Sequence, residues 1–155
     1  MTRRRPSKNS GTAGLSLLEM LVVVAILALA GSLLMPVLAR PSDAVRLQAS
    51  ARELVSALRV TRAAAITGNT DLALVLDVDQ RIFESPAVVR RVFAADITAQ
   101  VTFAEPERET PSRGGFRFFP DGSSTGGDVR LTLNGREAKI CIDWFTGAAR
   151  QNAKC

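Results

Sequence analysis

The stretch GLSLLEMLVVVAILALAGSLLMPVLA, residues 14–39, decides how this chain is organised. From Leu15 to Ala39 it runs for 25 residues, and Glu19 carries the only charge. Because a helix needs about 20 apolar residues to cross a bilayer, residues 15–39 are expected to form a transmembrane helix, bent near Pro36. A carboxylate costs roughly 2.5–3.5 kcal/mol at the centre of such a helix, and less towards its end. Glu19 therefore calls for a functional reason.

The segment before the apolar run, residues 1–14, is a basic leader. It carries Arg3, Arg4, Arg5 and Lys8 and no acid. Basic flanks stay in the cytoplasm, so the chain beyond Arg40 is expected outside. An ordinary secretory signal would be cleaved after its apolar core, and the residues at 36–39, PVLA, match such a site only loosely. The small residues of GTAG, 11–14, precede the core and favour processing on the cytoplasmic side.

The net charge and the residue composition argue against nucleic-acid binding, catalysis and metal binding. The net charge is +5, but the four basic leader residues account for most of it, leaving 16 basic and 15 acidic side chains. Nucleic acid is therefore not the expected partner. The chain has no histidine, which removes the usual general base and the common Ser–His and Cys–His arrangements. No enzyme activity, cofactor or metal is expected; the pair Asp77 and Asp79 fits a solvated hairpin tip better than a calcium site.

Residues 40–68 are expected to continue as an amphipathic helix. One face collects apolar residues at helical spacing: Leu47, Ala51, Leu54, Leu58 and Ala65. Ser42 or Asp43 can cap its start, and Gly68-Asn69 can end it. The apolar face is expected to pack on the chain's own sheet.

Residues 69–155 have the two-residue period of strands and are expected to form a β-rich periplasmic domain. DLALVLDVDQRIFES predicts a hairpin with a turn near Asp79-Gln80, and Asn134-Gly135 is a strong hairpin signal. Further strands are expected in AVVRRVF, ITAQVTFA, FRFF, VRLTL, AKICIDW and AAR, with EPERETPSRGG as a polar loop. The fold class is therefore α+β, one long helix followed by antiparallel strands.

The residues GLSLLE resemble the type IV prepilin signature: a glycine, a hydrophobic residue, three more residues and a glutamate. Leu15 and Ser16 stand where phenylalanine and threonine are usual. The resemblance implies cleavage between Gly14 and Leu15 and N-methylation of Leu15 by a prepilin peptidase. It also implies a role for Glu19 in assembly. The new α-amine of a neighbouring subunit could pair with Glu19, although the subunit's own amine is only about one turn (5.4 Å) away. Pro36 lies where pilin-like helices often bend.

Two further motifs, FRFFPDGSSTGG (116–127) and IDWFTGAAR (142–150), are similar to the H-type minor pseudopilins of type II secretion systems, the GspH/FimT-like family. That family implies a pilin-like fold and a place near the tip of a short periplasmic pseudopilus. The implied partners are other major and minor pseudopilins, the inner-membrane assembly platform and membrane lipid. The implied location is the bacterial inner membrane, crossed once, with the N-terminus cytoplasmic before cleavage. The alternative is a minor type IV pilin that binds DNA during uptake, although TGAARQNAK offers only Arg150 and Lys154 as basic residues.

The motif loop contains Pro120, Asp121, Gly122, Ser123, Ser124, Thr125, Gly126 and Gly127. Its composition is that of a structural turn. A phosphate-binding loop is not expected, because the strand, helix and lysine that accompany such a loop are missing from the pattern. Strand alternation places Ile140, Ile142 and Trp144 towards the core and Cys141 outward. Cys141 would then be accessible to Cys155 for a disulfide, with two unpaired thiols as the alternative.

Overall fold

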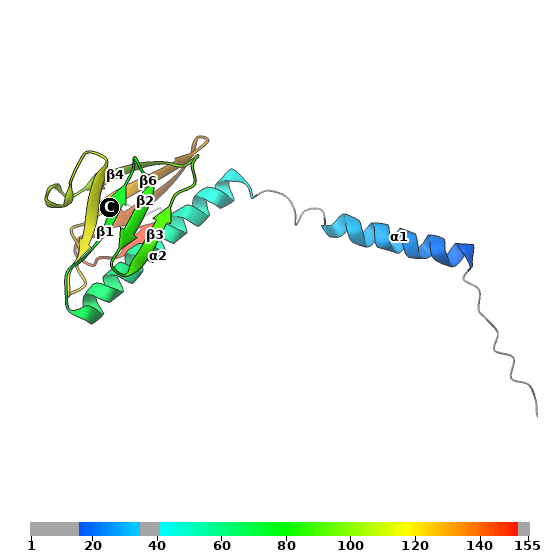
Figure 1. The fold of residues 1–155 in the computed structure, drawn as a ribbon, viewed down its shortest axis with the longest axis horizontal. Coiled ribbons are helices and arrows are strands. Elements are labelled where there is room, and N and C mark those ends of the chain that lie inside the picture. Colours follow the sequence, from blue (N-terminus) through cyan, green and yellow to red (C-terminus); the bar gives the residue numbers. More distant parts are fainter. Residues whose placement is uncertain (1–15, 35–40, 152–155) are drawn as a thin grey trace, which may run out of the picture. The chain divides into compact units, whose positions relative to one another are not determined.

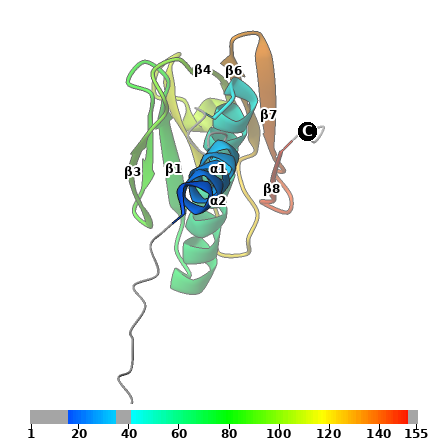
Figure 2. The same cartoon turned by 90° about the vertical axis from the view of Figure 1, so that its right-hand side faces the viewer.

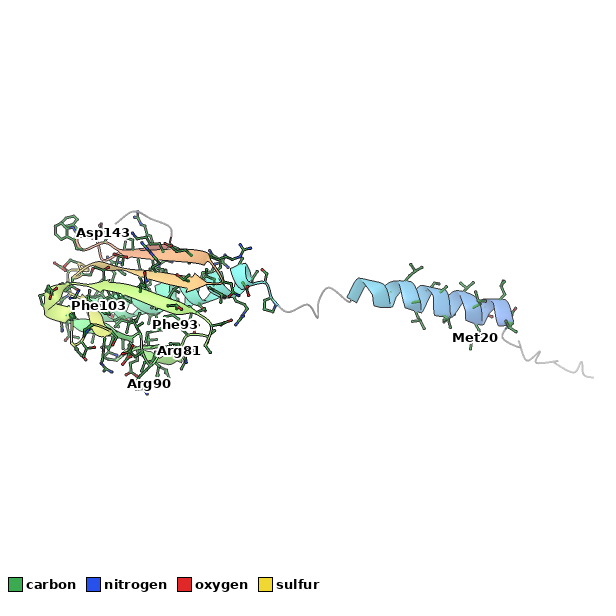
Figure 3. The ribbon with its side chains drawn as sticks, turned by 90° about the horizontal axis from the view of Figure 1, so that it is seen from above. Met20, Arg81, Arg90, Phe93, Phe103 and Asp143 are labelled. Carbon is green, nitrogen blue, oxygen red and sulfur yellow. The ribbon has the colours of Figure 1, made fainter. Side chains whose placement is uncertain are left out.

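The computed structural model describes residues 16–34 and 41–151, as two units divided at Arg40 and Pro41. In the first unit, α1 (Leu17–Leu34) starts where the Ser16 carbonyl accepts hydrogen bonds from the amides of Glu19 and Met20. Its side chains are exposed as far as they are described, including Met20 (Figure 3). Among the described residues, we find no helix whose length and apolarity would allow it to span a bilayer. The predicted span of 15–39 includes Leu15 and 35–39, which lie outside the described residues.

The second unit opens with helix α2 (Asp43–Gly68), whose ends are as the sequence predicts. Ser42 is the N-cap and accepts from the Val45 amide, and Asn69 takes the left-handed conformation at the C-cap (φ 48°). Left-handed backbone ends a helix because it turns the next amides back to the last carbonyls. All five predicted apolar positions are buried, and Val55, Ala57 and Thr61 widen the buried face.

Within residues 41–151, eight strands form two antiparallel sheets; Figure 1 shows them beside α2. The first sheet has the order β3-β2-β1-β5 and contains β1 (Leu72–Asp77), β2 (Ile82–Ser85), β3 (Val88–Val92) and β5 (Arg113–Phe118). The second has the order β4-β6-β7-β8 and contains β4 (Thr98–Phe103), β6 (Gly127–Leu133), β7 (Arg136–Ile142) and β8 (Ala149–Gln151). The α+β class and both predicted hairpins, at 78–81 and 134–135, are confirmed.

Helix α2 packs against both sheets and joins them through one core. Figure 2 shows it with β1 and β3 on one side and β7 and β8 on the other. The core combines its leucines with Phe83, Phe93, Phe103, Phe116 and Phe118. Two ring pairs, Phe83–Phe93 and Phe103–Phe116, have centroids 4.9 and 5.4 Å apart, in the range of favourable aromatic packing.

The predicted polar loop before β5 is partly wrong. A one-turn 3-10 helix, η2 (Glu105–Glu107), lies inside it, and β5 begins at Arg113, three residues before the predicted FRFF. Gly114 and Gly115 continue the ladder opposite Leu76 and Val75 of β1. A Cβ on Gly114 would stand 2.7 Å from the Phe103 ring, so glycine is needed here to let the ring close over the strand. A pattern of side-chain alternation cannot recognise such a strand.

Candidate interaction site

Two of the motifs singled out in the sequence meet at one end of the domain. We call residues 120–127 and 143–147 the paired loops. The Ser124 amide donates to the Trp144 carbonyl (2.8 Å), and the Ser124 hydroxyl donates to the Asp143 carbonyl (3.1 Å). The sheet explains the meeting, because Gly127 at the start of β6 is opposite Ile142 at the end of β7. Loops that lead into and out of these strand ends must lie side by side.

Glycines allow the paired loops to approach closely. Gly126 has φ +72°, and a Cβ there would stand 2.9 Å from the Cβ of Trp144. A Cβ on Gly147 (φ +64°) would collide with the carbonyl oxygen of Gly122. Both positions combine a backbone conformation that favours glycine with no room for a side chain. Gly126 and Gly147 therefore serve packing between the loops.

Arg62 ties the paired loops to the last turns of α2. Its Nε donates to the Gly122 carbonyl at 2.9 Å. The site therefore lies where α2 ends, and Asp143 is seen at that end in Figure 3. The opposite end of the domain, where α2 begins, is closed by different contacts, including Arg46 with Asp96 at 2.7 Å. The role of Arg62 could not be predicted from the sequence, since nothing in a helical pattern indicates which arginine reaches a distant loop.

Carboxylates fix the shape of each loop. Asp121 accepts hydrogen bonds from the Ser123 hydroxyl and amide (2.6 and 2.9 Å), which lower the pKa of Asp121 below its usual value. Asp143 accepts from the Thr146 amide and hydroxyl (2.7 and 2.8 Å), which lower the pKa of Asp143. The charge of Arg150 lowers it further. Both loops are thus held in defined turns by their own side chains.

Two aromatic side chains project from the second loop. Trp144 is 68% exposed and Phe145 is 72% exposed, and their rings meet edge to face with centroids 5.7 Å apart. The prediction that Trp144 faces the core is wrong, because β7 ends at Ile142 and strand alternation does not extend into the turn. Ile140 and Ile142 are buried as predicted. An exposed aromatic pair on a rigid turn is typical of protein–protein contact.

The remaining predicted positions divide into described and undescribed ones. Gly14, Leu15, Pro36 and Cys155 lie outside the described residues. Glu19 lies in the first turn of α1 and is exposed, where a carboxylate interacts favourably with the helix dipole.

Cys141 lies between Ile140 and Ile142, which are buried in the core, so its side chain is on the outer face of the sheet as predicted, although it is only 4% exposed. Its strand lies between β6 and β8, so Asp128 and Arg150 flank it on the same face. Cys141 is not a free cysteine, and its pairing with Cys155 stays a prediction.

The acids at the first hairpin have protein partners. Asp77 accepts from the Gln80 amide (2.8 Å) and pairs with Arg113 (3.4 Å), and Asp79 accepts from the Ser112 hydroxyl (2.5 Å). Across residues 16–34 and 41–151, no cluster of three or more acids, cysteines or histidines could hold a metal ion. Asp77 and Asp79 act in the structure of the hairpin and the start of β5.

The fold, a helix laid across two antiparallel sheets, defines a pilin-like protein. Comparison with solved structures agrees: the minor pseudopilin EpsH of the Vibrio cholerae type II secretion system has a TM-score of 0.56 at 14% identity. That match covers 70% of this chain and 97% of EpsH. The type IV minor pilin FimU of Pseudomonas aeruginosa has a TM-score of 0.52 at 15% identity, covering 69% and 88%. At these identities the likeness shows the fold alone.

Sequence comparison defines the family. Residues 50–147 match the family model described as type II transport protein GspH. The chain is also 34% identical over 148 residues to the type II secretion system protein H of Xanthomonas campestris pv. campestris, covering 96% of this chain and 88% of that protein. The chain therefore belongs to the GspH family.

Proposed function

We propose that this protein is a structural minor pseudopilin of a type II secretion system, without catalytic activity of its own. It would assemble near the pseudopilus tip and support export of folded proteins across the outer membrane. The observation that carries the proposal is the 34% identity, along 96% of the chain, to a relative named type II secretion system protein H.

The proposed route to assembly begins at the leader. A prepilin peptidase cleaves between Gly14 and Leu15 and methylates the new amine of Leu15. The helix of 15–39 holds the protein in the inner membrane by a single pass through lipid, bent near Pro36, with the domain from residue 41 in the periplasm. Glu19 pairs with the α-amine of a neighbouring subunit. The basic leader, the apolar length and the position of Glu19 support this route.

The proposed partners are the other major and minor pseudopilins and the inner-membrane assembly platform. The paired loops offer one surface of the domain for contact with a neighbour. Hydrogen bonds of Ser124 and two aspartates hold them in defined turns, and Arg62 of α2 donates to the Gly122 carbonyl. The loops also present Trp144 and Phe145 to solvent. A rigid apolar protrusion loses little conformational entropy when it binds.

The experiment is deletion of the gene and complementation with processing variants at native expression. Wild type should restore secretion of folded substrates and co-purify with other pseudopilins. Gly14→Val should keep its leader and restore neither, whereas the matched leader variant Gly11→Val should behave as wild type. Mass analysis of the N-terminus reads out cleavage. Normal secretion without the gene, together with loss of DNA uptake, would overturn the proposal in favour of a DNA-binding minor pilin.

A further inference from the structure

A groove between α2 and the edge of the second sheet is lined by arginines. It consists of two adjoining hollows of about 240 and 380 Å³, and Arg59 lines both. Arg52 lies in the first hollow, and Arg62 and Arg150 lie in the second. The helix residues share a face, because positions 52, 59, 62 and 66 follow one another at spacings of 7, 3 and 4. We call this feature the arginine groove.

None of the four arginines of the groove forms an ion pair with any residue that the structure describes. Most other described arginines do: Arg46, Arg90, Arg91, Arg108, Arg113, Arg117 and Arg130. Arg59 and Arg62 donate only to the carbonyls of Ala149 and Gly122. No acid lines either hollow. Asp143 lies close enough for the charge of Arg150 to lower its pKa, so it offsets part of that one charge. The groove is thus a concentration of largely uncompensated positive charge.

The floor and one wall of the groove suit a polypeptide. Ala63 and Ile66 give it apolar surface, and Ile66 is 41% exposed. The wall is β8, the last strand in the order of its sheet, and its Ala149 carbonyl is turned to Arg59. A guanidinium binds a carboxylate with two parallel hydrogen bonds, so aspartate and glutamate side chains fit this lining.

We propose that the arginine groove binds an acidic segment of a neighbouring pseudopilin. It thereby helps to determine which pseudopilin lies next to this subunit in the assembly. This inference rests on the proposed function and names the chemistry of one partner. Complementary charge favours correct over wrong partners and speeds encounter.

Two other occupants fit the groove less well. No aromatic side chain lines either hollow, so the groove offers no stacking surface for nucleic acid bases. A second copy of this chain would bring its most acidic loop, but Glu105, Glu107 and Glu109 are already paired with Arg108, Arg117 and Arg113. A different pseudopilin is the better source of free carboxylates.

The test places the photocrosslinking residue p-benzoylphenylalanine at Ala63, which is exposed, in the full-length chain in its native membrane. The expected adduct is with another pseudopilin, through a peptide that contains aspartate or glutamate. Arg52→Glu with Arg150→Glu should lower the adduct yield at least fivefold, because both changes reverse a charge that would bind the acidic segment. The fold should be kept, since neither side chain makes a hydrogen bond or ion pair within the described residues. The matched control is Arg136→Glu with Lys139→Glu, which makes the same charge change on β7 outside the groove and should change the yield less than twofold.

Four outcomes would overturn the inference: an adducted peptide without acids, an adduct with a second copy, a nuclease-sensitive adduct, or an equal yield from both double variants. If no adduct forms while the chain still co-purifies with other pseudopilins, the proposed role of the groove is wrong and the proposed function stands. Loss of co-purification by the wild-type chain itself would instead count against the proposed function.

Discussion

At the scale of single residues, Gly147 and Gly135 show two different reasons for glycine: lack of room for a side chain, and a left-handed backbone conformation. Both have positive φ, +64° and +75°, but a Cβ on Gly147 meets Gly122 and Arg62 while a Cβ on Gly135 meets nothing within 4 Å. Gly135→Ala should therefore cost about 1 kcal/mol of backbone strain. Gly147→Ala should cost about 1–3 kcal/mol more through overpacking.

Urea unfolding of the full chain in detergent measures both free energies. Trp144 is the only tryptophan, and the chain has no tyrosine, so its emission reports on the second loop. Gly147→Ala should shift that emission and Gly135→Ala should not. Equal costs and unshifted emission in both variants would mean that the loops do not depend on their close approach.

Glu19 gives a second prediction at this scale. Its carboxylate is costly in lipid, and pairing with a cleaved α-amine of a neighbour offsets that cost only in the assembly. Glu19→Ala should therefore insert at least as well as wild type, be cleaved after Gly14 and fold its outer domain, but lose recruitment by partner pseudopilins. Co-purification and secretion measure this, with Glu53→Ala on the exposed surface of α2 as the control. Full assembly at native expression would show that Glu19 has no role in assembly, and would leave pairing with its own amine, or simple tolerance of the carboxylate, as the explanation.

At the scale of elements, one hydroxyl links α2 to the first sheet. Thr61 and Thr67 both donate to the carbonyl four residues earlier at 2.9 Å. Thr61 is fully buried and also shares a hydrogen bond of 2.8 Å with Ser85 of β2, whereas Thr67 is exposed. Thr61→Val should lower the free energy of unfolding by about 1–3 kcal/mol, because the partly buried Ser85 hydroxyl loses its hydrogen-bond partner. Thr67→Val should stay within about 0.5 kcal/mol. Denaturant midpoints of the two variants compare them directly, and equal midpoints would contradict the link.

The turn at 143–147 should respond to acid. Hydrogen bonds from Thr146 place the folded-state pKa of Asp143 below its ordinary value of 3.8. The ionised Asp143 carboxylate therefore stabilises the folded turn fully above pH 3.8, and this stabilisation is lost as the pH falls through the lower pKa of the folded state. Trp144 emission should change in this acidic window in wild type. Asp143→Asn, which cannot ionise, should show a smaller acid-dependent change. A variant that follows the wild-type pH profile would assign the response to another group, such as Asp121.

At the scale of the whole molecule, the predicted Cys141–Cys155 disulfide would close a loop of about 15 residues over the second sheet, worth roughly 3 kcal/mol in the chain-entropy model. Cys155→Ser should lower the free energy of unfolding by up to that amount, and reductant should lower wild type similarly while leaving the variant unchanged. Mass analysis of unreduced protein should show the loss of two hydrogens. Two thiols open to alkylation in protein taken from the periplasm would exclude the bond.

Helix α2 shows why some of the fold could be predicted. Its stripe from Leu47 to Ala65, its Ser42 cap and its end at Gly68-Asn69 are encoded by residues a few positions apart. The hairpin at Asn134-Gly135 is equally local. The order of strands is different, because β1 pairs with β5 across 35 residues or more and depends on the core that α2 forms with both sheets.

The α+β class and the family resemblance could be read from the sequence alone, and so could the expectation of a leader and prepilin signature in residues 1–19, since each depends on composition or short spacing. Three features required the folded chain: loops 120–127 and 143–147 meet beside Arg62, Trp144 projects into solvent, and four arginines share one groove. These features arise where segments distant in the chain are brought together by burial of a common core. Local motifs mark the loops, but no local pattern shows which segments will meet, because that depends on how the core packs.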